Sequence, residues 1–187
     1  MRMKLYHTST MEISLPDIRH GRINADFGRG FYLTPDADFT YRWARKDAVV
    51  NEYELDLSGL RVHRFDRSEA WFDYIYQNRR ARDTLDVDVI IGPIANDTIF
   101  DTFGIISSGY LEPGNALKLL MIGPEYTQVA VKTERAAAQL TWLGAKAVTD
   151  VEAHRDALKT EMAEYDRLFA EQVEHILKHK NGAGPMH

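Results

Sequence analysis

The sequence predicts an α+β protein in which helices flank a mixed or antiparallel β-sheet and one long helix ends the chain. Short runs of alternating apolar and polar residues recur between helix-like segments, and a period of two is typical of half-buried strands. Several of these runs are short and polar on one side, which favours an antiparallel or mixed sheet over a parallel, doubly wound one. Beyond residue 150, apolar residues recur at helical spacing instead.

The N-terminal part is expected to hold two strands joined by a loop. Residues 4–7 form the first short strand, and the polar run at residues 8–10 ends it. Residues 16–24 contain turn-forming Asp, Gly and Asn, which predict a loop. Residues 26–34 place two glycines ahead of a β-prone run, so we expect a glycine-rich approach into a second strand.

A helix is expected over residues 36–46. Thr34 is predicted to cap it, Pro35 suits the first turn, and Asp36 favours the positive N-terminus. The apolar residues predicted to face inward are Phe39, Trp43 and Ala44.

The remaining elements follow from the same periodicities and from turn residues. Strands are predicted at residues 49–57, 60–65, 87–91, 126–132 and 140–148. Helices are predicted at residues 68–80, 96–106, 112–121 and 133–139. Turns are predicted at Ser58-Gly59, Gly92-Pro93, Ser108-Gly109 and Gly123-Pro124.

The chain divides into a compact domain and a C-terminal extension. Residues 1–149 form the domain, residues 150–180 the long helix, and residues 181–187 a flexible tail. The apolar stripe of the helix is more typical of core than of a partner surface. Its members are Leu158, Met162, Tyr165, Phe169, Val173, Ile176 and Leu177.

Composition excludes several classes of protein. The 187 residues include no cysteine, which excludes disulfides, thiolate metal sites and a cysteine nucleophile. No apolar run approaches the length of a membrane span, and the N-terminus lacks the pattern of a signal peptide, so a cytoplasmic protein without membrane partners is expected. The formal charge is −5, which gives no general attraction to nucleic acid. Six arginines between residues 61 and 82 are interspersed with acids, which favours a solvated mixed face over a nucleic-acid patch.

Three short stretches carry candidate chemistry. His7 ends the first strand, where it can bond a ribose hydroxyl or serve as a structural histidine bonded to its own loop. In the stretch from residue 27 to 34, Gly28 and Gly30 permit close approach of a ligand, Arg29 can reach a phosphate, and Tyr32 can stack on a base. The alternative there is a turn into a strand with core aromatic residues.

The third stretch is the strand that contains Gln128. A neutral amide donates and accepts hydrogen bonds but cannot act as a base. The alternative is a polar, outward-facing position on an alternating strand. Neither a dinucleotide-binding glycine motif before a helix nor a P-loop is present, which argues against those nucleotide sites.

Together these stretches resemble the ADP-ribosyltransferase superfamily. The order is that of its His-Tyr-Glu branch, which includes the poly-ADP-ribose polymerases and diphtheria-type toxins. More closely, the chain resembles a bacterial family of uncharacterised domains assigned to that superfamily. The matching stretches lie at residues 5–9, 26–34, 92–97 and 126–133, within a span of about residues 3–148.

The resemblance implies a split, mixed β-sheet with NAD⁺ lying across the cleft as substrate, and no metal. It implies that His7 holds the ribose beside the nicotinamide and that the backbone of Thr8, with Ser9 beside it, pairs with the carboxamide. It further implies that Tyr32 stacks on the nicotinamide and that Arg29 and Gly30 border the cofactor. The catalytic set is then His7, Tyr32 and Gln128.

Two residues depart from the pattern of the superfamily. Thr8 stands where glycine is usual, and Gln128 stands where many members carry glutamate. Glutamine cannot neutralise the positive charge that develops as nicotinamide leaves, so either another carboxylate helps or the acceptor brings its own activation. Glu125 and Glu134 are nearest in the sequence, although Glu125 faces the other side of a regular strand.

The resemblance favours a mono-ADP-ribosyltransferase that modifies a protein or nucleic acid, in the manner of a toxin of a toxin–antitoxin or phage-defence module, with an antitoxin as partner. A non-catalytic NAD⁺-binding module that docks a partner through the C-terminal helix is the alternative, followed by an interaction protein without ligand. Two other polar pairs have plainer interpretations. His175 and His179 are expected to be a surface pair. Asn96-Asp97 are candidate site residues, but a helix-capping role explains them equally well.

Overall fold

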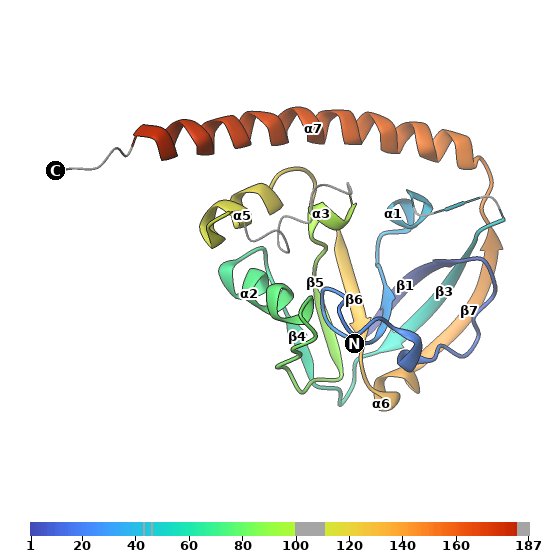
Figure 1. Ribbon diagram of the computed structural model, residues 1–187. Coiled ribbons are helices and arrows are strands. Elements are labelled where there is room, and N and C mark those ends of the chain that lie inside the picture. Colours follow the sequence, from blue (N-terminus) through green and yellow to red (C-terminus); the bar gives the residue numbers. More distant parts are fainter. Residues whose placement is uncertain (43, 46, 100–110, 183–187) are drawn as a thin grey trace.

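The computed structural model describes residues 1–42, 44–45, 47–99 and 111–182, and it contains two β-sheets (Figure 1). The three-stranded sheet has the order β1-β3-β7 and is formed by β1 (Arg2–Ser9), β3 (Val49–Asp56) and β7 (Leu140–Ala147). The four-stranded sheet has the order β2-β6-β5-β4 and is formed by β2 (Phe31–Leu33), β6 (Thr127–Val131), β5 (Val89–Pro93) and β4 (Val62–Arg64).

The strand pairing confirms the predicted α+β fold with split mixed and antiparallel sheets. Among the described strands, β4 and β5 pair in parallel and the other pairs are antiparallel. The two sheets meet where β1 passes β2. There the backbones of Tyr6 and Thr34 exchange two hydrogen bonds, of 2.8 and 3.0 Å. This bridge brings the end of β1 beside the glycine-rich stretch.

Alternation along β2 and β6 divides their side chains between two apolar clusters. One cluster fills the space between the sheets and includes Leu5, Phe31 and Val129. The other lies on the opposite face of the four-stranded sheet and includes Ala130, with Tyr32 packed against it. Both faces of β2 and β6 therefore carry apolar packing, although Tyr32 on the second face is only partly buried.

The helices surround the sheets largely as predicted. They are η1 (Ile18–His20), α1 (Ala37–Arg42), α2 (Glu69–Asn78), α3 (Asn96–Ile99), α5 (Pro113–Leu120), α6 (Glu134–Ala137) and α7 (Val151–Gly182). Ser68 caps α2 by accepting a hydrogen bond from the Trp71 amide. The short η1 falls within the segment that was predicted to be a loop.

Several predicted boundaries are wrong. Gly92-Pro93, predicted as a turn, forms the end of strand β5. Helix α1 ends at Arg42, four residues earlier than expected. Its cap is Asp36, whose Oδ1 accepts from the Phe39 amide at 3.0 Å, while Thr34 accepts from the Asp36 amide instead. Helix α7 continues to Gly182 rather than ending at residue 180. Trp43 lies outside the described residues. So do residues 100–110, which contain most of the expected 96–106 helix and the predicted Ser108-Gly109 turn, and the tail from residue 183.

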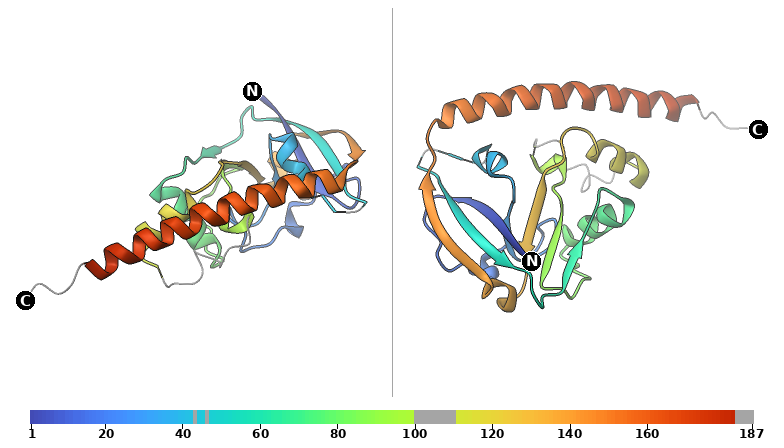
Figure 2. Two further views of the ribbon diagram at one scale, coloured as in Figure 1. Left: turned by 90° about the horizontal axis from the view of Figure 1, so that it is seen from above. Right: turned by 180° about the vertical axis from the view of Figure 1, so that it is seen from behind.

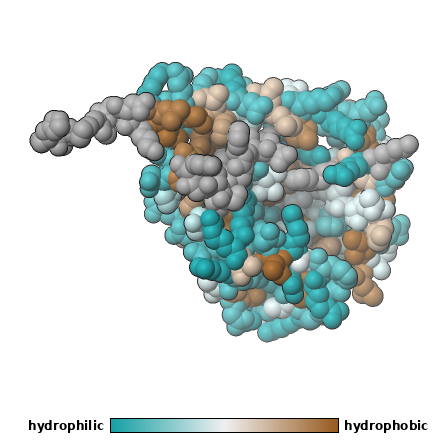
Figure 3. Space-filling view, viewed as in Figure 1, coloured by the Kyte–Doolittle hydropathy of each residue, from teal (hydrophilic) through white to brown (hydrophobic). Residues whose placement is uncertain are grey.

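Helix α7 lies across both halves of the domain (Figures 1 and 2). It contacts α1 at one end and α5 towards the other. Its apolar face packs on the domain, with Tyr165 and Ile176 only 1 % and 6 % exposed, but Leu177, predicted as a member of the same stripe, is 52 % exposed. Figure 3 shows a largely hydrophilic face on which apolar side chains gather in small groups. None of the helices within the described ranges combines the length and apolar character needed to cross a membrane.

Candidate functional site

His7 occupies the end of β1, where the two sheets meet. Its Nδ1 lies 2.7 Å from the carbonyl oxygen of Tyr32 on β2, so the bond is not to its own loop. Because a carbonyl only accepts, Nδ1 carries the proton. Burial lowers the pKa of His7, against the smaller effect of this hydrogen bond. The neutral ring therefore presents Nε2 as an acceptor, and Nε2 makes no hydrogen bond with the residues that the structure describes.

Tyr32 is turned towards the chain segment that precedes it. Its hydroxyl accepts from the Phe27 amide at 2.9 Å and donates to the Gly28 carbonyl at 2.7 Å. Burial, with a contribution from the Asp26 carboxylate, raises the pKa of Tyr32. The phenol is therefore neutral at physiological pH. It holds residues 26–28 in a tight turn, with its ring packed against the apolar cluster under α2.

Gln128 lies on β6 and projects from the face of the sheet that also carries Tyr32. The residue is only 7 % exposed, so the alternative of an outward-facing position is wrong. Its Nε2 donates to Asp26 Oδ2 at 3.3 Å and to the Pro93 carbonyl at 3.2 Å. Oε1 accepts no hydrogen bond within the described part of the chain. This oxygen is not completely buried either. The amide oxygen therefore keeps contact with solvent.

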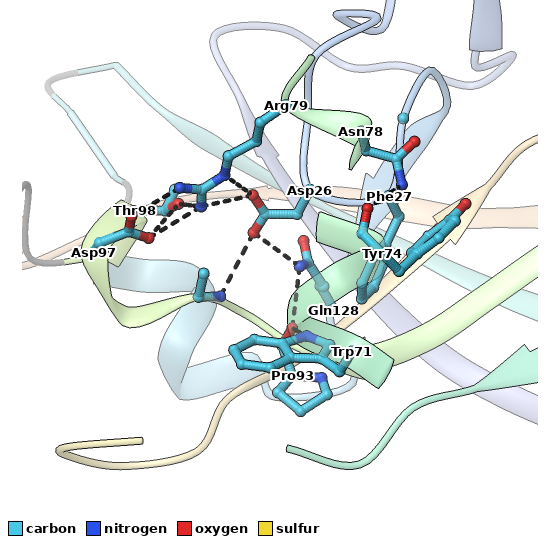
Figure 4. A network of polar contacts seen from close by, with 12 residues as sticks. Asp26, Phe27, Trp71, Tyr74, Asn78, Arg79, Pro93, Asp97, Thr98 and Gln128 are labelled. Carbon is cyan, nitrogen blue, oxygen red and sulfur yellow. Dashed lines mark hydrogen bonds and ion pairs between the residues drawn. The ribbon is translucent and has the colours of Figure 1, made fainter. Parts of the chain in front are cut away.

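A buried charged cluster adjoins Gln128 and was missed from the sequence (Figure 4). Arg79, the C-cap residue of α2, donates from Nε and Nη2 to Asp26 Oδ1 at 3.0 and 2.8 Å, and it binds Asp97 through two hydrogen bonds of 2.7 and 3.0 Å. Burial acts to lower the pKa of Arg79, but Asp26 and Asp97 hold it above its ordinary value. Arg79 was assigned to a mixed surface, and Asp97 was left open between a site residue and a helix cap. Neither interpretation predicted a buried salt bridge between them.

The segment 26–28 is thus fixed from several directions. Gly28 has a φ of +75°, and a Cβ there would lie 2.7 Å from Asp83 and 2.9 Å from Asn78, so the turn requires glycine. Lys132 donates to the Phe27 carbonyl and pairs with Asp83. The glycine at position 28 therefore has a structural cause.

The other predicted cofactor residues have mixed positions. Thr8 donates to the Thr40 carbonyl at 2.7 Å, so its side chain is bonded to α1. Ser9 accepts from the Met11 amide at 3.4 Å. A Cβ on Gly30 would lie 2.8 Å from the Val131 carbonyl, so close strand packing explains this glycine. Arg29 is exposed.

The structure ties the three predicted catalytic residues to one short stretch of chain without joining their side chains directly. His7 binds the main chain of Tyr32, Tyr32 binds the main chain at residues 27 and 28, and Gln128 binds Asp26. Tyr32 and Gln128 share one face of the sheet. The His7 ring packs 4.5 Å from Phe31, which belongs to the cluster on the other face.

The two glutamates considered as helpers lie elsewhere. Glu125 is 55 % exposed and pairs with Arg67, and Glu134 is 71 % exposed near Arg19. The carboxylate in contact with Gln128 is Asp26, from a segment 102 residues away in the sequence. Its position in the motif before Gly28 was the available signal, but only the fold shows what it touches.

The arginine-rich stretch is partly structural. Arg61 pairs with Asp86 and Asp88, Arg67 donates to the carbonyls of residues 121, 123 and 124, and Arg79 lies in the buried cluster. The expectation of a wholly solvated face is therefore wrong for Arg67 and Arg79, whose side chains are 9 % and 15 % exposed.

A pocket of about 330 Å³ lies apart from these residues, between α7 and the Gly123-Pro124 turn. Tyr165 and Leu168 contribute apolar walls, and no predicted site residue lines it. Across the described ranges, no group of three or more His, Asp or Glu side chains is arranged to hold a metal ion. His175 is described, whereas the side chain of its expected neighbour His179 is not.

Comparison with known proteins gives one family. The family model described as "Protein of unknown function (DUF3990)" matches residues 3–142. The match covers most of the chain, including β1, the glycine-rich stretch and Gln128, so the protein belongs to this family. No curated protein and no solved structure matches it.

Proposed function

For this member of the DUF3990 family, we propose the activity of a mono-ADP-ribosyltransferase that takes ADP-ribose from NAD⁺. The observation that carries the proposal is a pair of fixed acceptor atoms, Nε2 of His7 and Oε1 of Gln128, each without a partner in the described chain. A ribose offers hydroxyl donors to such acceptors. Tyr32, which lies between them in the network, supplies an aromatic surface for nicotinamide.

The reaction breaks the bond between ribose C1′ and the nicotinamide nitrogen. Nicotinamide leaves with the bonding electron pair, and positive charge develops on C1′ and the ring oxygen. A nucleophilic atom of the acceptor then bonds to C1′ and releases its proton. His7 and Gln128 hold the ribose hydroxyls during this step, and the negative charge around Gln128 favours the developing cation.

The acceptor is proposed to be a macromolecule, with protein favoured over nucleic acid. Three of the arginines between residues 61 and 82 are engaged within the fold, which leaves fewer of them for phosphate contacts. We extend the proposal to a cytoplasmic toxin of a toxin–antitoxin or phage-defence module, with an antitoxin as partner. This context rests on the sequence resemblance.

The test combines nicotinamide release with transfer of label. The purified chain is incubated with NAD⁺ labelled in its ADP-ribose part and with bacterial lysate, and labelled protein and RNA are separated. His7→Ala is expected to abolish both signals, while His20→Ala is the matched control because its side chain is 87 % exposed. Transfer that survives His7→Ala would refute the site.

The same experiment separates the alternatives. Thermal stabilisation by NAD⁺ without nicotinamide release would indicate a binding module, since a ligand that binds only the native state stabilises it. No stabilisation at millimolar NAD⁺ would indicate a protein without this ligand. Docking of a partner through α7 gains no support, because the apolar face of this helix is packed on its own domain.

A further inference from the structure

Asp26 touches the proposed site without being able to reach a ligand itself. The side chain is 9 % exposed. Oδ1 accepts twice from Arg79, and Oδ2 accepts from Gln128 at 3.3 Å and from the Ala95 amide at 3.5 Å. Figure 4 shows the carboxylate between Arg79 and Gln128. Any effect of Asp26 on a ligand therefore passes through the Gln128 amide.

The first effect is orientation of that amide. The two ends of a glutamine amide need different partners, because one end donates and the other accepts. At position 128 the inner end faces two acceptors, Asp26 Oδ2 and the Pro93 carbonyl, which also accepts from Trp71 at 3.1 Å. A flipped amide would lose both bonds and place three acceptor oxygens together. The carboxylate thus keeps Nε2 inward and Oε1 outward.

The second effect is charge. A hydrogen bond from an amide to a carboxylate is charge-assisted and polarises the amide, which makes its oxygen a stronger acceptor. The surrounding network holds three carboxylates, Asp26, Asp83 and Asp97, and two cations, Arg79 and Lys132. A surplus negative charge therefore lies behind a side chain that carries none itself.

We propose that Asp26 is a positioning residue of the reaction site. Acting through Gln128, it aims Oε1 at the ribose and supplies the negative charge that glutamine lacks. This inference rests on the proposed function. It also explains why glutamine suits position 128: a glutamate would turn a carboxylate oxygen towards two acceptors that now receive hydrogen bonds.

The test is a double-mutant cycle of the full chain with Asp26→Asn, Gln128→Glu and both changes together. In Asp26→Asn the new amide nitrogen faces Gln128 Nε2, so the Gln128 amide flips and Oε1 turns inward. The kcat of nicotinamide release is expected to fall by about 10- to 100-fold, with a smaller change in KM, because the charge to be stabilised develops in the transition state. Gln128→Glu is also expected to be slower than wild type.

The double variant restores a donor at residue 26 and an acceptor at residue 128. Its kcat is expected to exceed the value obtained if the two single effects multiplied. Asp88→Asn is the matched control, because Asp88 is also a buried carboxylate, 2 % exposed, that bonds Arg61 and Thr133 rather than Gln128. It is expected to lower stability and leave kcat per folded molecule unchanged.

Two results would overturn the inference. One is a kcat of Asp26→Asn that matches the Asp88→Asn control, and the other is strict multiplicativity in the double variant. Urea unfolding of the same proteins measures the coupling free energy between residues 26 and 128 without any need for turnover. A wild-type chain that neither binds NAD⁺ nor releases nicotinamide would refute the proposed function itself, and coupling in urea alone would then leave Asp26 a purely structural residue.

Discussion

The buried ion cluster gives the sharpest prediction about stability. Arg79→Met removes the cation that pairs with Asp26 and Asp97, whose side chains are 9 % and 1 % exposed. Two carboxylates are then left in the core without a counter-ion. Breaking a buried pair in this way costs about 3–5 kcal/mol, because the remaining charge stays desolvated.

Arg167→Met is the matched control. Arg167 on α7 also pairs with two carboxylates, Glu164 and Glu171, but all three side chains are more than half exposed. Surface pairs of this kind contribute about 0–1 kcal/mol. Urea unfolding of the two variants at neutral pH therefore compares the loss of unfolding free energy at a buried and at an exposed arginine, each with two carboxylate partners. A loss in Arg79→Met no larger than that in Arg167→Met would refute the reasoning.

Four further predictions use the same measurements. Gly28→Ala is expected to cost about 1–3 kcal/mol because it forces a side chain into the left-handed region, whereas Gly114→Ala, in open space on α5, is expected to stabilise by about 0.5–1 kcal/mol; equal effects in urea would contradict this. Tyr32→Phe leaves the amide and carbonyl of residues 27–28 without a partner and is expected to cost about 1–3 kcal/mol, measured by thermal unfolding. Because burial lowers the pKa of His7, the contribution of this residue to stability is full above the ordinary histidine pKa of about 6.5 and is lost as pH falls through the lowered pKa. His7→Gln should therefore lose less stability on acidification than the wild-type protein. Parallel curves of unfolding free energy against pH for the two proteins would argue against this. Ile176→Ala is expected to cost about 2–5 kcal/mol in the isolated protein, because α7 packs on the core; a neutral result would instead indicate a docking helix.

The fold was predictable because its signals are local. Alternation marks the strands, and capping and turn residues mark the ends of helices, as the Ser68 cap of α2 shows. The boundary at α1 was harder, since both Thr34 and Asp36 are good caps and the choice depends on the bridge that binds the Thr34 backbone to Tyr6. Local periodicity does not determine the order of strands in a sheet. The pairing of β2 with β6 could therefore be seen only in the structure.

The candidate site was predictable only in part. His7, Tyr32 and Gln128 belong to short motifs that can be recognised in order along the chain. Of their charged partners, Asp26 lies in one of these motifs and Arg79 in none. The two residues are 53 positions apart and meet only through the packing of α2 on the sheet. An arginine among other charged residues gives no sign that it will be buried, and burial here follows from pairing with two carboxylates.

The chemistry at position 128 depends on a second residue that sequence comparison at that position alone does not reveal. A motif that expects glutamate treats glutamine as a loss of charge. In this fold the charge lies one hydrogen bond further back, on Asp26, and the amide connects it to the solvent-facing side. Replacing glutamine by glutamate without changing residue 26 would place two carboxylates in contact, and like charges so close cannot both ionise without cost. We therefore expect positions 26 and 128 to act together, and a glutamate at 128 to require an amide or other donor at 26.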